Sequence, residues 1–189
     1  GIGLEGWTVE EGKIPYLAGQ SEGAAFAKTA AKGTMGNPYE VGTVDALRNM
    51  VSGKSYVLTA DIELGEWTAI GSYTAPFFGN LDGAGHRLYG VEIKTGAVGI
   101  FGYLNGRIKD LRVEIAAACS GNEQRYAGGI AAYGLDAVVE DCFATVDFDF
   151  QANGVAAAGI VGYLDGGWIV RCAAEGSIKA ASSNPSAYA

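Results

Sequence analysis

Two carboxylates have the residue types and spacing that best suit chemistry in this chain. Asp147 and Asp149 flank Phe148, so strand alternation places both on the outer face of one strand, ~6.5–7 Å apart. That separation is compatible with the general acid and base of glycoside hydrolysis. The aligned positions of the neighbouring repeats hold two alanines on one side, and Ser177 and Lys179 on the other. A solvated face with an Asp149–Lys179 contact is the more economical interpretation, and polysaccharide chemistry remains the alternative.

Three tyrosines recur at a fixed interval of 30 residues. Tyr103, Tyr133 and Tyr163 occupy the same position of three successive repeats, so we expect an aromatic column. Such a column would either stack on sugar rings or pack at a corner of the fold, and corner packing is the favoured interpretation. With Asp147 and Asp149, these tyrosines are the candidate ligand-binding residues.

Other reactive residues carry no catalytic signature. His86 is the single histidine and sits in a glycine-rich corner. No Gly-x-Ser-x-Gly elbow is present, and the three cysteines lack metal-type spacing. The calcium-like turn Asp82–Gly85 occurs once, whereas calcium-binding turns of this kind need many copies. The sequence therefore predicts a chain that is not an enzyme and needs no cofactor or metal.

The charge balance narrows the partners. The net charge is -8, with 13 basic and 21 acidic residues, so the chain lacks the cationic surface that displaces counterions from nucleic acid. No run of ~18 apolar residues is present to span a bilayer. We therefore expect neither nucleic-acid binding nor membrane insertion by this chain.

The elements that position these residues follow from a repeat of 30 residues. The segments Gly99–Tyr103 (GIFGY), Gly129–Tyr133 (GIAAY) and Gly159–Tyr163 (GIVGY) are copies of one pattern. Thirty glycines in 189 residues suit frequent tight corners between short strands. Two or three strands per unit, repeated in register, predict a right-handed parallel β-helix.

Two internal ladders follow from aligning the repeats. Ile100, Ile130 and Ile160 would form one, and Leu111, Cys142 and Cys172 the other, with both thiols packed as small apolar groups. A second strand would turn two further sets inward, Ile115 with Val146 and Gly176, and Ala117 with Phe148 and Ile178. An earlier copy is expected at Leu88–Val91, with Leu88 matching Ile108.

The N-terminal part differs in composition from the repeats. Residues 1–36 are interpreted as the tail of a preceding unit followed by a linker, and residues 37–189 as the β-helical domain. Within that domain, Thr43 can N-cap a short helix in which Val44, Leu47, Met50 and Val51 are apolar. We expect this helix to cap the first coil, because an uncovered coil exposes half a hydrophobic column.

The repeated segments resemble a known family. Gly99–Gly102 and Gly159–Gly162 are similar to the GLUG motif of bacterial surface proteins, and Gly129–Ala132 is a degenerate copy. The lead-in segments Trp67–Gly71 and Phe78–His86 are also similar to that family. The resemblance covers about residues 38 to 189.

Membership of the GLUG-motif family would imply function and localisation. It implies a bacterial cell-surface or secreted protein that serves adhesion or acts as a stalk, with a host glycan or matrix protein as partner. It also allows a spacer or targeting role beside a peptidase domain, as in immunoglobulin A peptidase-type chains. No catalytic residue of the family can be carried over to this chain.

One expectation concerns the last repeat. Tyr188-Ala189 resembles Tyr126-Ala127, which precedes the middle copy of the motif, so another coil would begin there. The domain is therefore interpreted as truncated at its C-terminal end. An open last coil would pair end to end with another molecule.

Overall fold

The fold was analysed in a computed structural model of the chain. The structure describes residues 7–8, 16–17, 30–121, 125–152 and 154–181. The chain divides into two units, Gly1–Ala30 and Ala31–Ala189. In the first unit, β1 (Trp7–Thr8) pairs antiparallel with β2 (Tyr16–Leu17).

The second unit is built almost entirely from strands. Its described residues include one helix, α1 (Val44–Arg48). The strands of its first coils are β3 (Tyr39–Val41), β4 (Ser55–Leu58), β5 (Ile62–Glu66), β6 (Asn80–Asp82), β7 (Arg87–Ile93), β8 (Phe101–Leu104), β9 (Arg107–Lys109) and β10 (Arg112–Gly121). The later strands are β11 (Arg125–Gly128), β12 (Ala131–Glu140), β13 (Phe143–Ala152), β14 (Val155–Ala158), β15 (Val161–Val170) and β16 (Ala173–Ala181).

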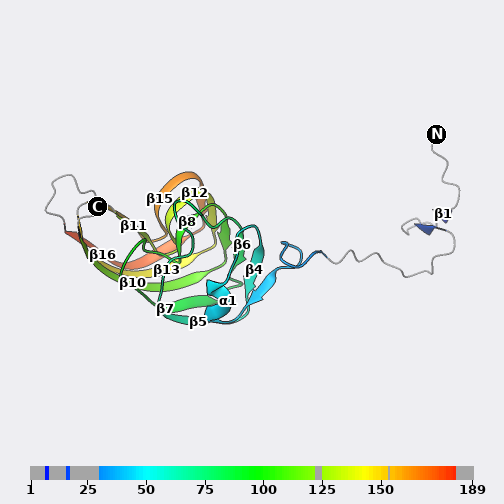
Figure 1. Cartoon of the computed structure of the whole chain (residues 1–189), viewed down its shortest axis with the longest axis horizontal. Helices are drawn as coiled ribbons and strands as arrows, with labels where there is room; N and C mark the ends of the chain where they lie inside the picture. Colours follow the sequence, from blue (N-terminus) through cyan, green and yellow to red (C-terminus); the bar gives the residue numbers. More distant parts are fainter. Residues whose placement is uncertain (1–6, 9–15, 18–29, 122–124, 153, 182–189) are drawn as a thin grey trace. The chain divides into compact units, whose positions relative to one another are not determined.

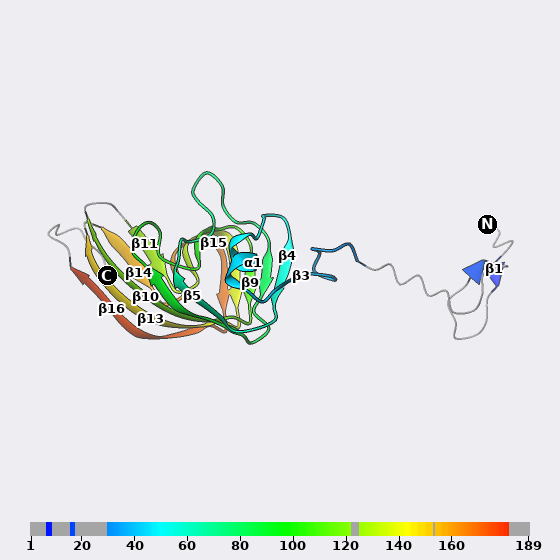
Figure 2. The same cartoon turned by 60° about the horizontal axis from the view of Figure 1, so that its bottom comes forward.

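These strands form stacked parallel sheets. A seven-stranded sheet has the order β15-β12-β9-β6-β4-β3, with β8 also pairing with β12, and a five-stranded sheet has the order β16-β13-β10-β7-β5. A short third sheet pairs β11 with β14. Figures 1 and 2 show the long strands lying one above another as the chain winds from β5 to β16. The predicted parallel β-helix is confirmed as a β-solenoid of about four turns.

The core is a column rather than a centre. Ile100 and Ile130 are fully buried, and Ile160 packs on the same cluster with partial exposure. Backbone hydrogen bonds from Phe101 N to the Ile130 carbonyl and from Ile130 N to the Ile160 carbonyl, both 2.9 Å, join the three rungs. Every coil contributes apolar side chains to this column, so one hydrophobic core runs the length of the solenoid.

The second ladder runs along a corner. Leu111 and Cys142 are buried and Cys172 is half-buried, and the backbone bonds from Phe143 N to the Leu111 carbonyl and from Ala173 N to the Cys142 carbonyl join their coils. The residues just before them turn the corner with positive φ: Asp110 at 54°, Asp141 at 53° and Arg171 at 52°. Non-glycine residues adopt this left-handed region of φ only at a cost in free energy. Its recurrence at the same corner of three coils indicates that the shape of the corner requires it.

The predicted register of the later coils is confirmed. Ile115, Val146 and Gly176 lie in one row, and Ala117, Phe148 and Ile178 in another. The earlier alignment is wrong: Leu88 pairs with Val113, and Leu81 takes the place beside Ile108. Coils before residue 98 are shorter, and the register shifts between Val113 and Ile115 where β10 meets β7.

A helix caps the first coil, as predicted. The Thr43 side chain accepts a hydrogen bond from Ala46 N (3.2 Å), and Leu47 is fully buried. Arg48 donates to the Glu66 carbonyl (3.0 Å) and lies over the Trp67 ring. Val51 does not extend the apolar stripe, because it follows the helix end at Arg48 and is exposed. No helix among the described residues has the length and hydropathy to cross a membrane.

The opposite end is uncovered in the described part of the chain. Strands β15 and β16 are the edges of their sheets, and they are ten and nine residues long. Ile169 and Ile178 point inward by register, yet they are 43% and 42% exposed. The two ends of the solenoid therefore differ: the first coil is capped, and the last described coil presents apolar side chains.

Candidate functional site

The tyrosines at 30-residue intervals form a stacked column along the seven-stranded sheet. Tyr103 pairs in register with Tyr133, and Tyr133 with Tyr163. Their ring centroids are 5.2 and 5.1 Å apart, with interplanar angles of 25° and 22°. The separation follows the ~4.8 Å spacing of hydrogen-bonded strands.

Two more tyrosines extend this column. The ring of Tyr126 lies edge-on to Tyr133, at 5.4 Å and 75°, and contacts Tyr163 at 5.4 Å. Tyr73, on the exposed segment between β5 and β6, is edge-on to Tyr103 at 5.9 Å. We call Tyr73, Tyr103, Tyr126, Tyr133 and Tyr163 the tyrosine cluster.

The stacking decides which parts of the rings are available. Tyr133 stacks with Tyr103 on one side and with Tyr163 on the other, so a sugar ring cannot lie flat on it. The parts of Tyr133 that remain for a ligand are its ring edge and hydroxyl group. Tyr163 is the last ring of the column and is 46% exposed. Flat stacking on a ligand ring is therefore limited to the end of the column, whereas hydrogen bonding is available along it.

An aspartate polarises the middle of the column. The Tyr133 hydroxyl donates to Asp165 Oδ2 at 3.3 Å, from the next coil. Desolvation, and then the negative charge of Asp165, raise the pKa of Tyr133, so this phenol stays protonated. It serves as a hydrogen-bond donor.

Asp147 and Asp149 lie on a different face, the outer side of the five-stranded sheet. Both are exposed on β13. Beside them the outward side chains of β10 are Ala116 and Ala118, which are short, so a groove runs along β10. Its other wall is formed by Glu92 of β7 and by Lys94, which follows the end of that strand, and Lys179 of β16 also lines the groove.

The two carboxylates differ in their partners. Asp147 Oδ1 accepts a hydrogen bond of 2.5 Å from the Ser177 hydroxyl. Asp149 is the register partner of Lys179. One carboxylate is therefore held by a neutral donor, whereas the contact expected between Asp149 and Lys179 is a register pairing and not one of the ion pairs of the described residues. The structure does not bring this pair together with the tyrosines, because the two sets belong to different sheets.

A charged strip crosses the same outer face near the first corner. Arg87 donates to Asp61 Oδ2 and to Glu114 Oε1, each at 3.0 Å, and thereby joins three coils. The Arg87 backbone N–H, followed by its guanidinium, holds the pKa of Asp61 below its usual value. His86 Nδ1 lies 3.3 Å from Asp61 Oδ1. These groups satisfy one another, which is typical of a structural network.

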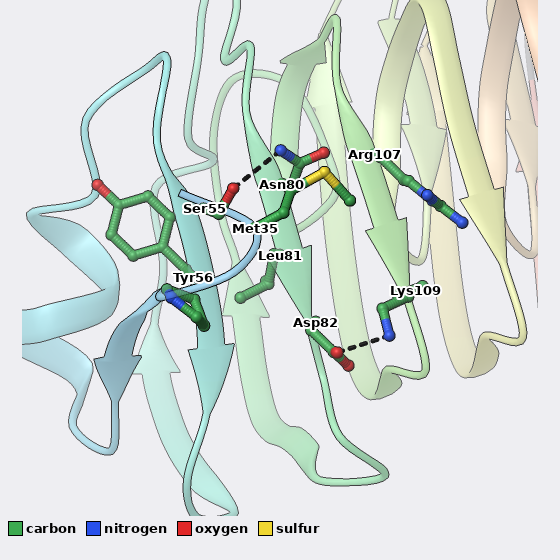
Figure 3. Close-up of a pocket in the computed structure, with 9 residues that line it drawn as sticks. Met35, Ser55, Tyr56, Asn80, Leu81, Asp82, Arg107 and Lys109 are labelled. Carbon is green, nitrogen blue, oxygen red and sulfur yellow. Dashed lines mark hydrogen bonds and ion pairs between the residues drawn. The ribbon is translucent and has the colours of Figure 1, made fainter. Parts of the chain in front are cut away.

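A small hollow lies on the outer face of the seven-stranded sheet, under the loop that carries Met35 (Figure 3). Asn80 donates to the buried Ser55 hydroxyl at 3.0 Å, and Lys109 pairs with Asp82 at 2.6 Å. Arg107, at its rim, pairs with Glu140 of the next coil. The polar groups of this hollow are thus bonded to one another across adjacent strands.

The described cysteines and acidic groups lack the arrangement of a metal site. Among the described residues, no group of three His, Cys, Asp or Glu side chains is arranged to hold a metal. Burial raises the pKa of Cys142 to about 12, so its thiolate is strongly disfavoured. Cys142 therefore behaves as an apolar core group.

Sequence reasoning missed three parts of the tyrosine cluster and its surroundings. Tyr126 is replaced by Ala156 in the next repeat, so no periodic signal marks it. Tyr73 lies in a segment outside the repeat, and Asp165 occupies a position that is Leu135 in the preceding coil. The alignment of Ala116 and Ala118 with the aspartates is visible in the sequence, whereas the groove that these short side chains leave is visible only in the structure.

No protein-family model, no curated protein and no solved structure matches the chain. Function is therefore inferred from the geometry of the chain itself.

Proposed function

We propose that this chain is a non-catalytic β-solenoid module of a bacterial surface or secreted protein, which acts as an adhesive surface or stalk. The tyrosine cluster is the observation that carries the proposal. Its stacked rings follow one another at intervals of 5.2 and 5.1 Å along the seven-stranded sheet, with ring edges and hydroxyl groups available for contact. The repeats' resemblance to the GLUG motif supports the same role and an extracellular or cell-surface location.

The chemistry of the cluster favours a polyhydroxylated or peptide partner. Phenol hydroxyls donate to and accept from hydroxyl and amide groups, and each such bond contributes ~0.5–1.5 kcal/mol. Tyrosine also offers a large contact area at low conformational-entropy cost. A host glycan or a matrix protein matches both properties.

The test is capture on a glycan and host-matrix array. Replacing Tyr103, Tyr133 and Tyr163 together by Phe retains the stack and removes the hydroxyl groups. We expect capture to weaken about tenfold or more, whereas Tyr39→Phe, an exposed tyrosine outside the cluster, leaves it unchanged. Equal capture by the wild type and the triple variant would contradict the proposal.

A polysaccharide-acting domain is the second candidate, and the groove along β10 is the observation that favours it. The groove holds Asp147 and Asp149 on one wall and is open along the strand. The variant with both aspartates changed to Asn distinguishes the candidates. Loss of turnover on a glycan would support the enzyme, and unchanged capture would support the adhesive module.

A further inference from the structure

Strand β16 has a free edge that is self-complementary. It runs from Ala173 to Ala181 and pairs on one side with β13; no described strand pairs with its other side. Ala173 N bonds to the Cys142 carbonyl of the preceding coil. Because backbone groups alternate sides along a strand, those of Ala174, Gly176, Ile178 and Ala180 face the free edge. The edge can therefore template another strand.

The charges on β16 select both the partner and the register. Glu175 and Lys179 are on the outer face, two residues either side of Ser177. When a second copy of β16 runs antiparallel and both are centred on Ser177, Glu175 of each copy lies opposite Lys179 of the other. A register centred on Gly176 or Ile178 does not oppose these charges. Opposite charges directly across two strands stabilise the pairing, and here there are two such pairs.

The inner face fits in the same register. Gly176 lies opposite Ile178, so a position without a side chain meets a large one, and Ala174 lies opposite Ala180. The nine residues of the strand are all used, because Ala173 and Ala181 are also equidistant from Ser177. The exposed Ile178 side chains then enter a core shared by the two copies.

The capped end excludes a head-to-tail stack. There the sheet edges are β5 and β3, which are five and three residues long. The buried side chain of Leu47 in helix α1 covers this end, and Arg48 donates a hydrogen bond to the backbone carbonyl of Glu66, so that carbonyl is already bonded. Among the strands that the structure describes, long free edges therefore occur only at the β16 end, and two such ends meet through a two-fold axis.

We propose that two copies of this chain associate through β16, antiparallel and centred on Ser177, into a closed dimer of solenoids. This inference is independent of the proposed ligand, because no member of the tyrosine cluster belongs to β16 or to the five-stranded sheet that contains it.

The first test is a cross-link at the symmetry axis. Ser177 lies opposite itself in the dimer, at a non-hydrogen-bonded pair where Cα atoms are ~4.5 Å apart, within disulfide range. Full-length Ser177→Cys, incubated with oxidised glutathione, should give a covalent dimer. Asp147→Cys is the matched control, since it occupies the same outer row one coil inward. The wild-type chain, with its three cysteines, gives the baseline.

The second test is a charge swap, followed by analytical ultracentrifugation. The Glu175→Lys substitution places a lysine opposite Lys179 at both ends of the pairing. The resulting repulsion should raise the dimer dissociation constant about tenfold or more. Adding Lys179→Glu should restore most of the affinity, and Glu63→Lys, on the edge strand of the capped end, should have no effect. Thermal melts of each variant distinguish a weakened interface from a weakened fold.

Several results would overturn the proposal. If the chain is a monomer at all concentrations and Ser177→Cys gives no covalent dimer, a second copy does not pair with the edge of β16, and the proposal is wrong. Equal cross-linking of the Ser177→Cys and Asp147→Cys variants would exclude the register. Open-ended polymers of the wild type would exclude the two-fold contact.

Discussion

Arg171 and Asp141 lie one coil apart at the same corner of the solenoid and form a bidentate ion pair. Arg171 Nε is 2.6 Å from Asp141 Oδ1, and Arg171 Nη2 is 2.7 Å from Asp141 Oδ2. Both residues have positive φ, so the pair connects two turns of the same strained shape. The planar guanidinium matches the carboxylate in a way that an ammonium group cannot.

This ion pair predicts a contribution to acid stability. The hydrogen bonds from Arg171 hold the pKa of Asp141 below its usual value. A lowered native pKa means that the stabilisation is present above the unfolded-state pKa and is lost as the pH falls through the native pKa. Asp141→Asn should therefore melt like the wild type at the lowest pH and slightly below it at neutral pH. Thermal melts from pH 2 to 7 measure this, and an unchanged difference across that range would contradict it.

The isoleucine ladder predicts a position-dependent cost of truncation. Ile130→Ala removes a fully buried side chain and should lower the free energy of unfolding by about 2–5 kcal/mol. Ile160→Ala, in the half-covered rung, is the matched control and should cost clearly less. Ile130→Asp should abolish the cooperative melt, because an unpaired carboxylate would lie in an apolar column. Urea titrations at low protein concentration compare the variants, and equal costs at residues 130 and 160 would be inconsistent with the ladder.

Two glycines separate backbone strain from steric overlap. Gly85 has φ of 78° with open space where a Cβ would lie, so Gly85→Ala should cost about 1–2 kcal/mol from φ strain alone. Gly167 has φ of 89°, and a Cβ there would lie 2.0 Å from the Ala137 carbonyl oxygen of the adjacent coil. Gly167→Ala should therefore cost at least twice as much in chemical denaturation. Similar midpoints for the two variants would argue against the close contact.

The Cys142 thiol should be unreactive in the folded chain. Its pKa is raised to about 12 by burial, so almost none of it is thiolate at pH 8. Alkylation with iodoacetamide at pH 8, followed by peptide mass spectrometry, should label Cys142 at least a hundredfold more slowly in the native chain than in denaturant. Rapid native labelling would show that the corner opens.

The tyrosine cluster should contribute to stability as well as to binding. Tyr133 contacts three other rings, so Tyr133→Ala should cost about 2 kcal/mol or more in urea titrations. Tyr73→Ala removes one edge contact from a side chain that is 80% exposed and should cost much less. Equal urea midpoints for the two variants would mean that the ring contacts of Tyr133 do not stabilise the fold.

The repeat made the later coils predictable at the level of single residues. Copies of the motif 30 residues apart are sufficient to align the inward rows of β13 and β16, because stacking requires equivalent residues at equivalent heights. The same logic fails for Leu88, since the early coils are shorter and the ladder is interrupted near Gly90. The alternation of apolar and polar residues along a strand does not predict at which residue such a register shift occurs.

The candidate site was less predictable than the fold. The tyrosine column follows from spacing, but the orientation of its rings depends on Tyr126, which has no periodic signal. Strand β12 has one residue more than the stretch of β8 and β9 with which it pairs. The extra residue is accommodated near Asp136, which has a φ of 48°. The separation in sequence between paired residues therefore changes from 30 (Leu104 with Gly134) to 31 (Arg107 with Val138). The predicted pairing of Leu111 with Cys142 already contains this offset, but Arg107 pairs with Glu140 diagonally, two residues beyond its register partner Val138, and an alignment of repeats does not indicate such a contact.

The cap at α1 also gives the chain an order of assembly. Each coil rests on the coil before it, and the helix that shields the first coil precedes β4 to β16 in the sequence, so it leaves the ribosome before they do. Synthesis at ~5–20 residues per second delivers a later coil of about 30 residues every few seconds. Every new turn therefore meets a finished surface beneath it, and nascent strands are matched to their neighbours one turn at a time.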